Sequence, residues 1–277
     1  DQKYRFRAES DHVWLSGWTE PDAVLVLDAG LPDGAVLYRL DGERRDTDEF
    51  WRSRTRGEFW NGRRFPHAVV EYMTGIPCRD LDDLSEALTT GSLVMRGIDR
   101  SVDAALAAST DDAALARVVS DLRLTKDAYE IEQLTHAVEI TQRGFDDVIA
   151  EWSQVRAHGE RWIEGTFERR ARLEGNGVGY ASIAAAGAHA TTLHWIDNSG
   201  PVTDGQLVLM DMGVEADSLY TADITRTVPA SGVFTAAQRE VYEIVERAQD
   251  AAMAAVRPGA AFRAFHHAAT EVLAHGL

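Results

Sequence analysis

The sequence is poor in cysteine and in basic residues, and it has no long apolar run. With only Cys78 among 277 residues, no disulfide can form within the chain, which fits a reducing compartment, and we expect a cytoplasmic location. No apolar stretch approaches the roughly 18 residues that a membrane-spanning helix needs. Lys and Arg number 28 against 45 Asp and Glu, a formal net charge of −17. Because nucleic acids and anionic membranes bind basic surfaces, the charge excludes both as partners.

The length of the chain is sufficient for two domains, each with its own core. In residues 1–120, apolar runs at 23–27, 36–39 and 93–96 predict strands, and the segments 66–74 and 82–88 predict helices. Residues 4–15 alternate loosely and predict an extended segment. Interleaved strands and helices favour an α/β domain. We expect a boundary near residue 120 and a second domain over residues 121–277.

The second domain combines capped helices with strands. Asp127 followed by Glu130 has the form of a capping box, and an apolar stripe predicts a core-facing helix behind it. The stripe consists of Ile131, Leu134, Val138, Phe145, Val148, Ile149 and Trp152. Another helix is expected from residue 160 to 173, and a capping box at Thr235 predicts a third long helix.

Two aspartates flank a predicted β-hairpin between these helices. Residues 207–209 and 219–228 favour strands, and residues 216–218 favour the hairpin tip. With Asp217 as the pivot, Asp211 would lie opposite Asp223, with Cβ atoms roughly 4.5–5.5 Å apart. Two carboxylates in that arrangement repel each other, so something must offset the cost.

A divalent cation between the carboxylates would offset this repulsion, because hard cations prefer carboxylate oxygens. Two such carboxylates could hold two ions about 3.5–4 Å apart, a spacing that activates a bridging water. The alternative is two aspartates near a turn that point into solvent in different directions. The apolar neighbours of Asp211 disfavour its exposure, but spacing alone leaves both interpretations open.

Three stretches around this hairpin carry a resemblance. They are Leu-Val-Leu-Met-Asp-Met-Gly at 207–213, Ala-Asp-Ile-Thr-Arg-Thr-Val-Pro at 222–229 and Gly-Val-Phe-Thr-Ala-Ala-Gln-Arg-Glu-Val-Tyr at 232–242. The sequence resembles the Xaa-Pro aminopeptidase (aminopeptidase P) and prolidase group of pita-bread metallopeptidases. The resemblance implies that Asp211 binds one metal ion and that Asp223 bridges two. The spacing is one residue longer here than is usual in the family, which we expect to change the turn and not the ligands.

The same resemblance assigns roles to a tyrosine and a histidine. The stretches Tyr-Ala-Ser-Ile at 180–183 and Leu-His-Trp at 193–195 are similar to stretches of the family at the same separation. The family pattern implies that His194 contacts the scissile carbonyl or its oxyanion and that Tyr180 lies beside the metal-bound water. On the residues alone, His194 is more simply a core histidine with its hydrogen bonds satisfied.

Residues 4–27 resemble the middle of the aminopeptidase P N-terminal domain. Glu-Phe-Trp-Asn-Gly-Arg-Arg at 58–64 is similar to a loop that, in oligomeric members, carries an aromatic residue into a neighbouring active site, which makes Trp60 a substrate-binding candidate. Asp11 and Arg123 resemble a pair that ties the N-terminal domain to the catalytic cleft. Without the resemblance, Trp60 is a surface or core tryptophan and the pair is an ordinary salt bridge.

The resemblance implies an α/β N-terminal domain followed by an α+β pita-bread (creatinase/aminopeptidase-like) catalytic domain that is incomplete at its C-terminus. It further implies hydrolysis of the bond between an N-terminal residue and a following proline, with two divalent ions, manganese in preference to cobalt or zinc. The expected partners are peptides with proline at the second position, and the expected assembly is a homo-oligomer, a dimer or tetramer. The N-terminal stretch favours aminopeptidase P over prolidase, which splits only Xaa-Pro dipeptides.

The remaining metal ligands of the family, one His and two Glu, lie downstream of the stretch that this sequence covers. We therefore expect a chain truncated at both ends and inactive alone. Two alternatives stay open: a metal-free pita-bread domain that binds peptides or proteins, and a generic acidic α/β interaction domain. The joint presence of Asp211, Asp223, Tyr180 and His194 favours the enzyme, because a binding module has no chemical need for all four.

Overall fold

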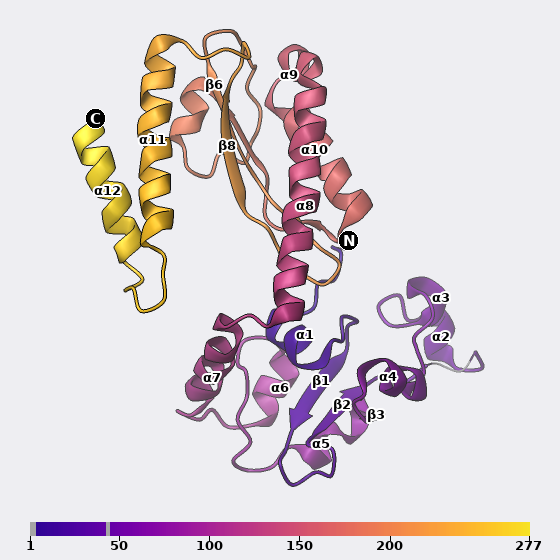
Figure 1. Cartoon of the computed structure of the whole chain (residues 1–277). Coiled ribbons are helices and arrows are strands. Elements are labelled where there is room, and N and C mark those ends of the chain that lie inside the picture. Colours follow the sequence, from indigo (N-terminus) through magenta and orange to yellow (C-terminus); the bar gives the residue numbers. More distant parts are fainter. Residues whose placement is uncertain (1–3, 43–44) are drawn as a thin grey trace. The chain divides into compact units, whose positions relative to one another are not determined.

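The computed structural model describes residues 4–42 and 45–277, which divide into two units, Asp1–Thr125 and Lys126–Leu277 (Figure 1). The division follows the end of helix α7 (Asp112–Leu124). The boundary expected at residue 120 lies inside this helix, where it would cut a continuous run of hydrogen-bonded backbone.

The first unit contains a small mixed sheet of order β1-β2-β3. Strands β1 and β2 are antiparallel and β2 and β3 are parallel. Trp18, Leu37 and Val70 form its buried cluster. The elements are α1 (Ser10–Ser16), β1 (Ala23–Leu27), β2 (Ala35–Arg39), α2 (Asp48–Arg52), α3 (Glu58–Asn61), α4 (His67–Thr74), β3 (Cys78–Asp80), η1 (Leu81–Asp83), α5 (Leu84–Ala87), α6 (Arg100–Ala105) and α7.

Two sequence-based predictions for this unit are wrong. Residues 10–16 are helical and not extended, because the Glu9 side chain caps the helix start and Gly17 ends it in the left-handed conformation. Residues 93–96 form no strand: the Val94 amide donates to Asp112 Oδ1 and the Arg96 guanidinium donates to Asp112 Oδ2. A carboxylate therefore takes the hydrogen bond that a neighbouring strand would have accepted.

The second unit is built on an antiparallel sheet of order β5-β6-β8, and a two-stranded ladder joins β4 to β7. In Figure 1, α8 and α10 lie on one side of β6 and β8, whereas α11 and α12 lie on the other. The elements are α8 (Ala128–Ala150), α9 (Trp152–His158), α10 (Glu160–Glu174), β4 (Gly177–Val178), β5 (Ile183–Ala186), η2 (Gly187–Thr191), β6 (Leu207–Met212), β7 (Val214–Glu215), β8 (Ile224–Pro229), α11 (Ala236–Ala255) and α12 (Ala264–Gly276).

Helix α8 begins as predicted, and its predicted apolar stripe is buried only in part. The capping box at Asp127 is present. Phe145 and Val148 of the stripe are buried, whereas Ile131, Val138 and Ile149 are exposed. Ala137 and Gly144 are also buried, although the stripe did not include them. Gly144 lies directly against Phe167 of α10, so close packing of the two helices buries a small residue that an apolar pattern overlooks.

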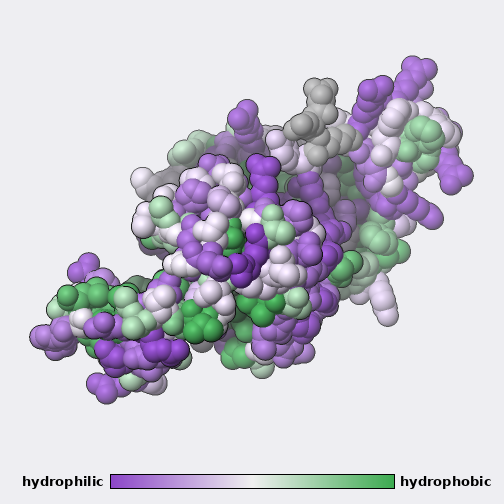
Figure 2. Space-filling model, turned by 90° about the horizontal axis from the view of Figure 1, so that it is seen from above, coloured by the Kyte–Doolittle hydropathy of each residue, from purple (hydrophilic) through white to green (hydrophobic). Residues whose placement is uncertain are grey.

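Helix α11 is only partly covered by α12. The capping box predicted at Thr235 is present, and Ile244 and Ala248 are buried. Val241 and Met253 remain exposed, and Figure 2 shows apolar surface interspersed with polar surface on the face that it draws. Within residues 4–42 and 45–277, every helix is too short or too polar to cross a lipid bilayer.

Two helix-interior glycines test whether close packing governs this unit. A Cβ on Gly144 of α8 would lie 2.6 Å from the ring of Phe167, whose side chain is fully buried, whereas a Cβ on Gly165 of α10 would meet nothing within 4 Å. We expect Gly165→Ala to stabilise the protein by about 0.5–1 kcal/mol, because alanine favours a helix over glycine. Gly144→Ala should instead destabilise it by about 1–3 kcal/mol through overpacking. Urea denaturation of both variants provides the measurement, and equal stabilisation by the two would contradict the packing described.

Candidate active site

The two aspartates of the hairpin are not directly opposite each other. Asp211 in β6 pairs with Thr225 in β8, and the prediction that Asp211 lies opposite Asp223 is wrong by two residues. Because side chains on a strand alternate between faces with a period of two, a shift of two residues leaves both carboxylates on the same face. The aspartates are therefore diagonal neighbours.

The shift has its cause at the hairpin tip. Ala216 accepts a hydrogen bond from the Leu219 amide at 2.8 Å and donates its own amide to Tyr220 O at 2.9 Å. The loop thus contains three residues, 217–219, and is not centred on Asp217. Leu219 has a φ of 66°, the left-handed conformation that closes such a loop. Leucine rarely adopts the left-handed conformation, so no local pattern predicts this turn.

The hydroxyl of Tyr180 brings the two carboxylates together. It donates a hydrogen bond to Asp211 Oδ1 at 2.6 Å and lies 3.1 Å from Asp223 Oδ1. Asp211 is partly buried and Asp223 is exposed. Three of the residues singled out from the sequence therefore meet at one point, although they lie in different parts of the chain.

The electrostatics of this cluster keep Tyr180 protonated. Burial raises the pKa of Tyr180 far above its usual range, and the hydrogen bond to Asp211 and the charges of Asp211 and Asp223 raise it further. The phenol is therefore a permanent donor. One hydrogen is shared between two acceptors, however, so the repulsion between the carboxylates is only partly relieved.

Two glycines make this arrangement sterically feasible. The Gly179 amide donates to Gly213 O at 2.9 Å, which brings the segment before Tyr180 next to the hairpin. A Cβ on Gly213 would lie 1.7 Å from Ala222 O, and one on Gly179 would lie 2.1 Å from a methyl group of Thr221. Only glycine permits this approach. Gly213 interrupts a strand pattern directly after Asp-Met, which is a recognisable sequence signal for close backbone contact.

The cluster fits a divalent cation in part. Asp211 and Asp223 present hard carboxylate oxygens on one face, as such cations prefer. Among the residues the structure describes, no group of three or more His, Cys, Asp or Glu side chains is arranged to hold a metal ion. In the part of the chain that the structure describes, this cluster therefore offers two of the four to six or more ligands that closed coordination takes.

His194 lies in the loop that follows η2 and is exposed, which does not agree with a core histidine. The loop itself is anchored by two buried polar residues, Glu160 and Asn198, each 0% exposed. Sequence reasoning gave neither of them a role. Their partners are separated from them by up to 40 positions, and no local pattern indicates such contacts.

Asp11 and Arg123 form an ion pair within the first unit. Asp11 lies in α1 and Arg123 in the last turn of α7, so the pair joins two helices that are far apart in the sequence. The structure thus places the two residues together, and their role in substrate binding remains a proposal.

Trp60 lies in α3 and is 49% exposed. Its indole donates to Trp51 O at 2.8 Å, and the Arg54 guanidinium lies 5.2 Å from the ring centroid. Trp60 is therefore a surface residue whose side chain is restrained by a hydrogen bond and a cation–π contact, and it is not part of the core.

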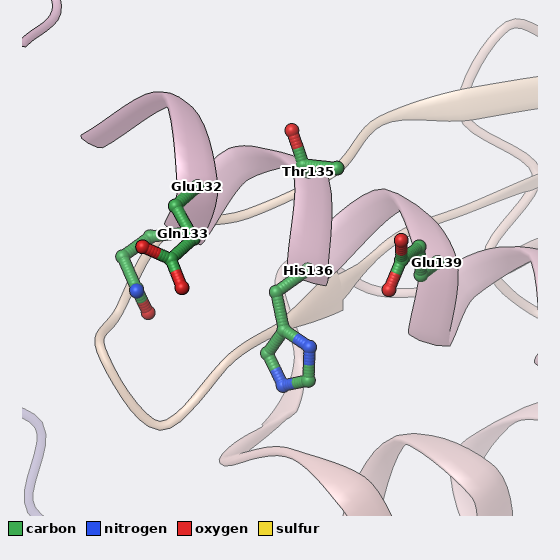
Figure 3. A pocket seen from close by; sticks show the side chains of 5 residues that line it. All are labelled: Glu132, Gln133, Thr135, His136 and Glu139. Carbon is green, nitrogen blue, oxygen red and sulfur yellow. The ribbon is translucent and has the colours of Figure 1, made fainter. Parts of the chain in front are cut away.

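A cavity of about 500 Å³ lies against α8 and contains none of the predicted site residues. Figure 3 shows that all of its lining side chains come from this single helix. Those side chains are Glu132, Gln133, Thr135, His136 and Glu139.

The sequence matches known proteins along its whole length. Residues 132–277 match Metallopeptidase family M24, and residues 1–92 match the aminopeptidase P N-terminal domain. Xaa-Pro aminopeptidase 2 of Streptomyces coelicolor is 50% identical, over 99% of this chain and 60% of that protein. Human Xaa-Pro aminopeptidase 3 is 29% identical, over 94% of this chain and 53% of that protein. The chain thus spans about three fifths or less of the length of these curated relatives.

Solved structures of aminopeptidases resemble this chain as well. Aminopeptidase PepP of Pseudomonas aeruginosa has a TM-score of 0.81 at 25% identity, covering 99% of this chain and 64% of that one. Zinc-substituted aminopeptidase P of Escherichia coli in complex with product has a TM-score of 0.82 at 26% identity, covering 100% and 66%. These matches confirm the predicted α/β N-terminal domain followed by a pita-bread domain, and they support divalent metal ions as cofactors.

Removing the hydroxyl of Tyr180 should destabilise the metal-free protein. In Tyr180→Phe, both carboxylates lose their common donor, and we expect the free energy of unfolding to fall by about 1–2 kcal/mol. Urea denaturation in the presence of a chelator provides the measurement. Tyr129→Phe is the control, because Tyr129 is 58% exposed and its variant should stay within about 0.5 kcal/mol of the wild type. A loss no larger than that of the control would show that the hydroxyl does not hold the carboxylates together.

Proposed function

The chain belongs to metallopeptidase family M24, and on this basis we propose that the whole protein is an Xaa-Pro aminopeptidase. Its substrates would be peptides with proline at the second position, and it would hydrolyse the bond before that proline. The observation that carries the proposal is the meeting of Asp211, Asp223 and Tyr180 on one face of the hairpin. The match of residues 1–92 to an aminopeptidase P domain favours this activity over that of a prolidase.

Two divalent ions, manganese in preference to cobalt or zinc, would supply the Lewis acidity that makes a water nucleophilic near neutral pH. Asp211 and Asp223 would hold part of this metal centre, together with ligands from the rest of the protein. Tyr180 keeps its proton, so its hydroxyl can donate a hydrogen bond to the carboxylates or to a water beside them. A hydroxyl that donates in this way would orient a nucleophilic water.

His194 would donate a hydrogen bond to the carbonyl oxygen as negative charge develops there, the kind of stabilisation that lowers barriers to acyl transfer. The departing proline nitrogen has no N–H in the substrate and must gain a proton before it leaves. Neither Tyr180 nor the two aspartates suits that task, because the phenol is held as a donor to carboxylates. A further acid outside this cluster is therefore required.

The first unit would contribute to substrate binding. Trp60 offers an exposed aromatic face, and Asp11 and Arg123 form a fixed ion pair. We propose that these residues contact the peptide or line its binding site. We further propose that the protein forms a homo-oligomer, a dimer or tetramer, and is located in the cytoplasm.

The metal role of Asp223 can be tested against a second aspartate of the same hairpin. In the full-length protein, Asp223→Asn should lower the release of the N-terminal residue from an X-Pro-X peptide by more than about a hundredfold, because a direct ligand matters at least as much as the groups that orient it. Asp217→Asn at the exposed tip removes the same charge and should leave the rate within about twofold. A chelator should abolish the wild-type activity, and added Mn²⁺ should restore it.

Full activity of Asp223→Asn would refute the metal role. A wild-type protein that binds X-Pro-X peptides without cleaving them, in the presence of Mn²⁺, would instead favour the metal-free binding module.

A further inference from the structure

The carboxylate of Glu160 is fully buried and accepts four hydrogen bonds. Its Oε1 accepts from the Ala186 amide at 2.7 Å and from His189 Nδ1 at 2.8 Å. Its Oε2 accepts from Trp195 Nε1 at 2.9 Å and from the Gly200 amide at 2.6 Å. One side chain at the start of α10 therefore holds the beginning, the middle and the end of a single loop.

This loop, residues 186–200, carries His194. The imidazole of His194 is exposed and directly precedes Trp195, whose indole is fixed on two sides. Glu160 binds its Nε1, and the His189 ring stacks on it with centroids 3.9 Å apart and an interplanar angle of 23°. The backbone of His194 is thus restrained through its neighbour.

A second buried residue joins the loop to the strand next to the hairpin. Asn198 Oδ1 accepts from the Ala184 amide at 2.8 Å, and its Nδ2 donates to Ser182 O at 2.9 Å. The residue between these two, Ile183, pairs with Asp211 across β5 and β6. The loop is therefore attached to the same sheet that carries one of the candidate metal ligands.

Two glycines are required where the loop meets the start of α10. A Cβ on Gly200 would lie 2.5 Å from His189 Cε1 and 2.9 Å from Glu160 Oε1. A Cβ on Gly159, which precedes α10, would lie 2.3 Å from Gly200 O. The loop and the helix start fit each other only because both positions are glycine.

We propose that Glu160 is a positioning residue for the reaction: through Trp195 and His189 it holds His194 where the scissile carbonyl is attacked. The inference rests on the proposed function, because the location of His194 matters to a rate only if that chemistry occurs. Burial raises the pKa of Glu160, but its four hydrogen bonds outweigh burial and hold the pKa of this carboxyl below its usual range. The ionised carboxylate accepts at both oxygens, so His189 Nδ1 must carry a hydrogen.

The test uses the full-length, metal-loaded protein and an X-Pro-X peptide. Glu160→Gln preserves size but replaces one acceptor oxygen with an amide donor, so two of the four donors lose their partner. We expect kcat to fall by about ten- to a hundredfold, because displacing a catalytic group slows the chemical step more than it weakens substrate binding. KM should change by less than about twofold. In a His194→Ala background, Glu160→Gln should cause no further loss, since the two residues act as one unit.

Glu151→Gln is the matched control. Glu151 also binds an indole, that of Trp162, and accepts from Thr166 and Arg169, but it does not touch the loop. The Glu151→Gln variant should have a lower melting temperature than the wild type, and its kcat should stay within about twofold of the wild-type value. Trp195→Phe removes a single donor from Glu160 and serves as the milder variant if Glu160→Gln does not fold; it should lower kcat in the same direction.

Hydrogen exchange gives a readout that does not depend on activity. Amides of residues 186–200 should lose protection in Glu160→Gln and keep it in Glu151→Gln. Equal kcat losses from Glu160→Gln in the presence and absence of His194, or unchanged protection of the loop, would overturn the positioning role while the proposed function stands. An inactive wild-type protein with Mn²⁺ bound would overturn the proposed function, and the positioning role with it.

Discussion

The structure depends on an electrostatic constraint: Asp211 and Asp223 are held on one face of a β-ribbon, close enough for a single hydroxyl to contact both. Like charges in this arrangement repel, and a fold does not retain them unless something offsets the cost. Tyr180 offsets part of it, because its raised pKa keeps a hydrogen available. We propose that a divalent cation offsets the remainder, since the chain belongs to family M24, a family of metallopeptidases. The two strands approach so closely beside Asp223 that Gly213 cannot carry a side chain, because its Cβ would lie 1.7 Å from Ala222 O.

The surroundings of the site are built from buried polar groups that join distant segments. Strand β5 pairs with β6, which carries Asp211, so a segment that is hydrogen-bonded to β5 has a defined position with respect to Asp211. Asn198 forms that tie, and Glu160 gathers the loop that carries His194. Each of these side chains has its hydrogen-bonding groups satisfied, which buried polar groups require. A network of this kind fixes a loop more firmly than apolar contacts alone, because each hydrogen bond has a direction.

Much of this could be read from the sequence, and the failures have physical causes. Capping boxes predicted the starts of α8 and α11 because they are local, reciprocal contacts. The hairpin was predicted with the wrong register but the correct face, because an error of two residues preserves the alternation of side chains. The left-handed turn at Leu219 and the four partners of Glu160 carry no local signal. The proposed metal-binding roles of Asp211 and Asp223 rest on a resemblance to a family, since spacing alone left a solvent-exposed pair open.

Anomalous X-ray diffraction from crystals of the full-length protein grown with Mn²⁺ tests the central claim most directly. The account predicts an anomalous peak within about 2–2.5 Å of carboxylate oxygens from both Asp211 and Asp223. A map without a peak between them, with the two side chains on opposite faces of the ribbon, would contradict it.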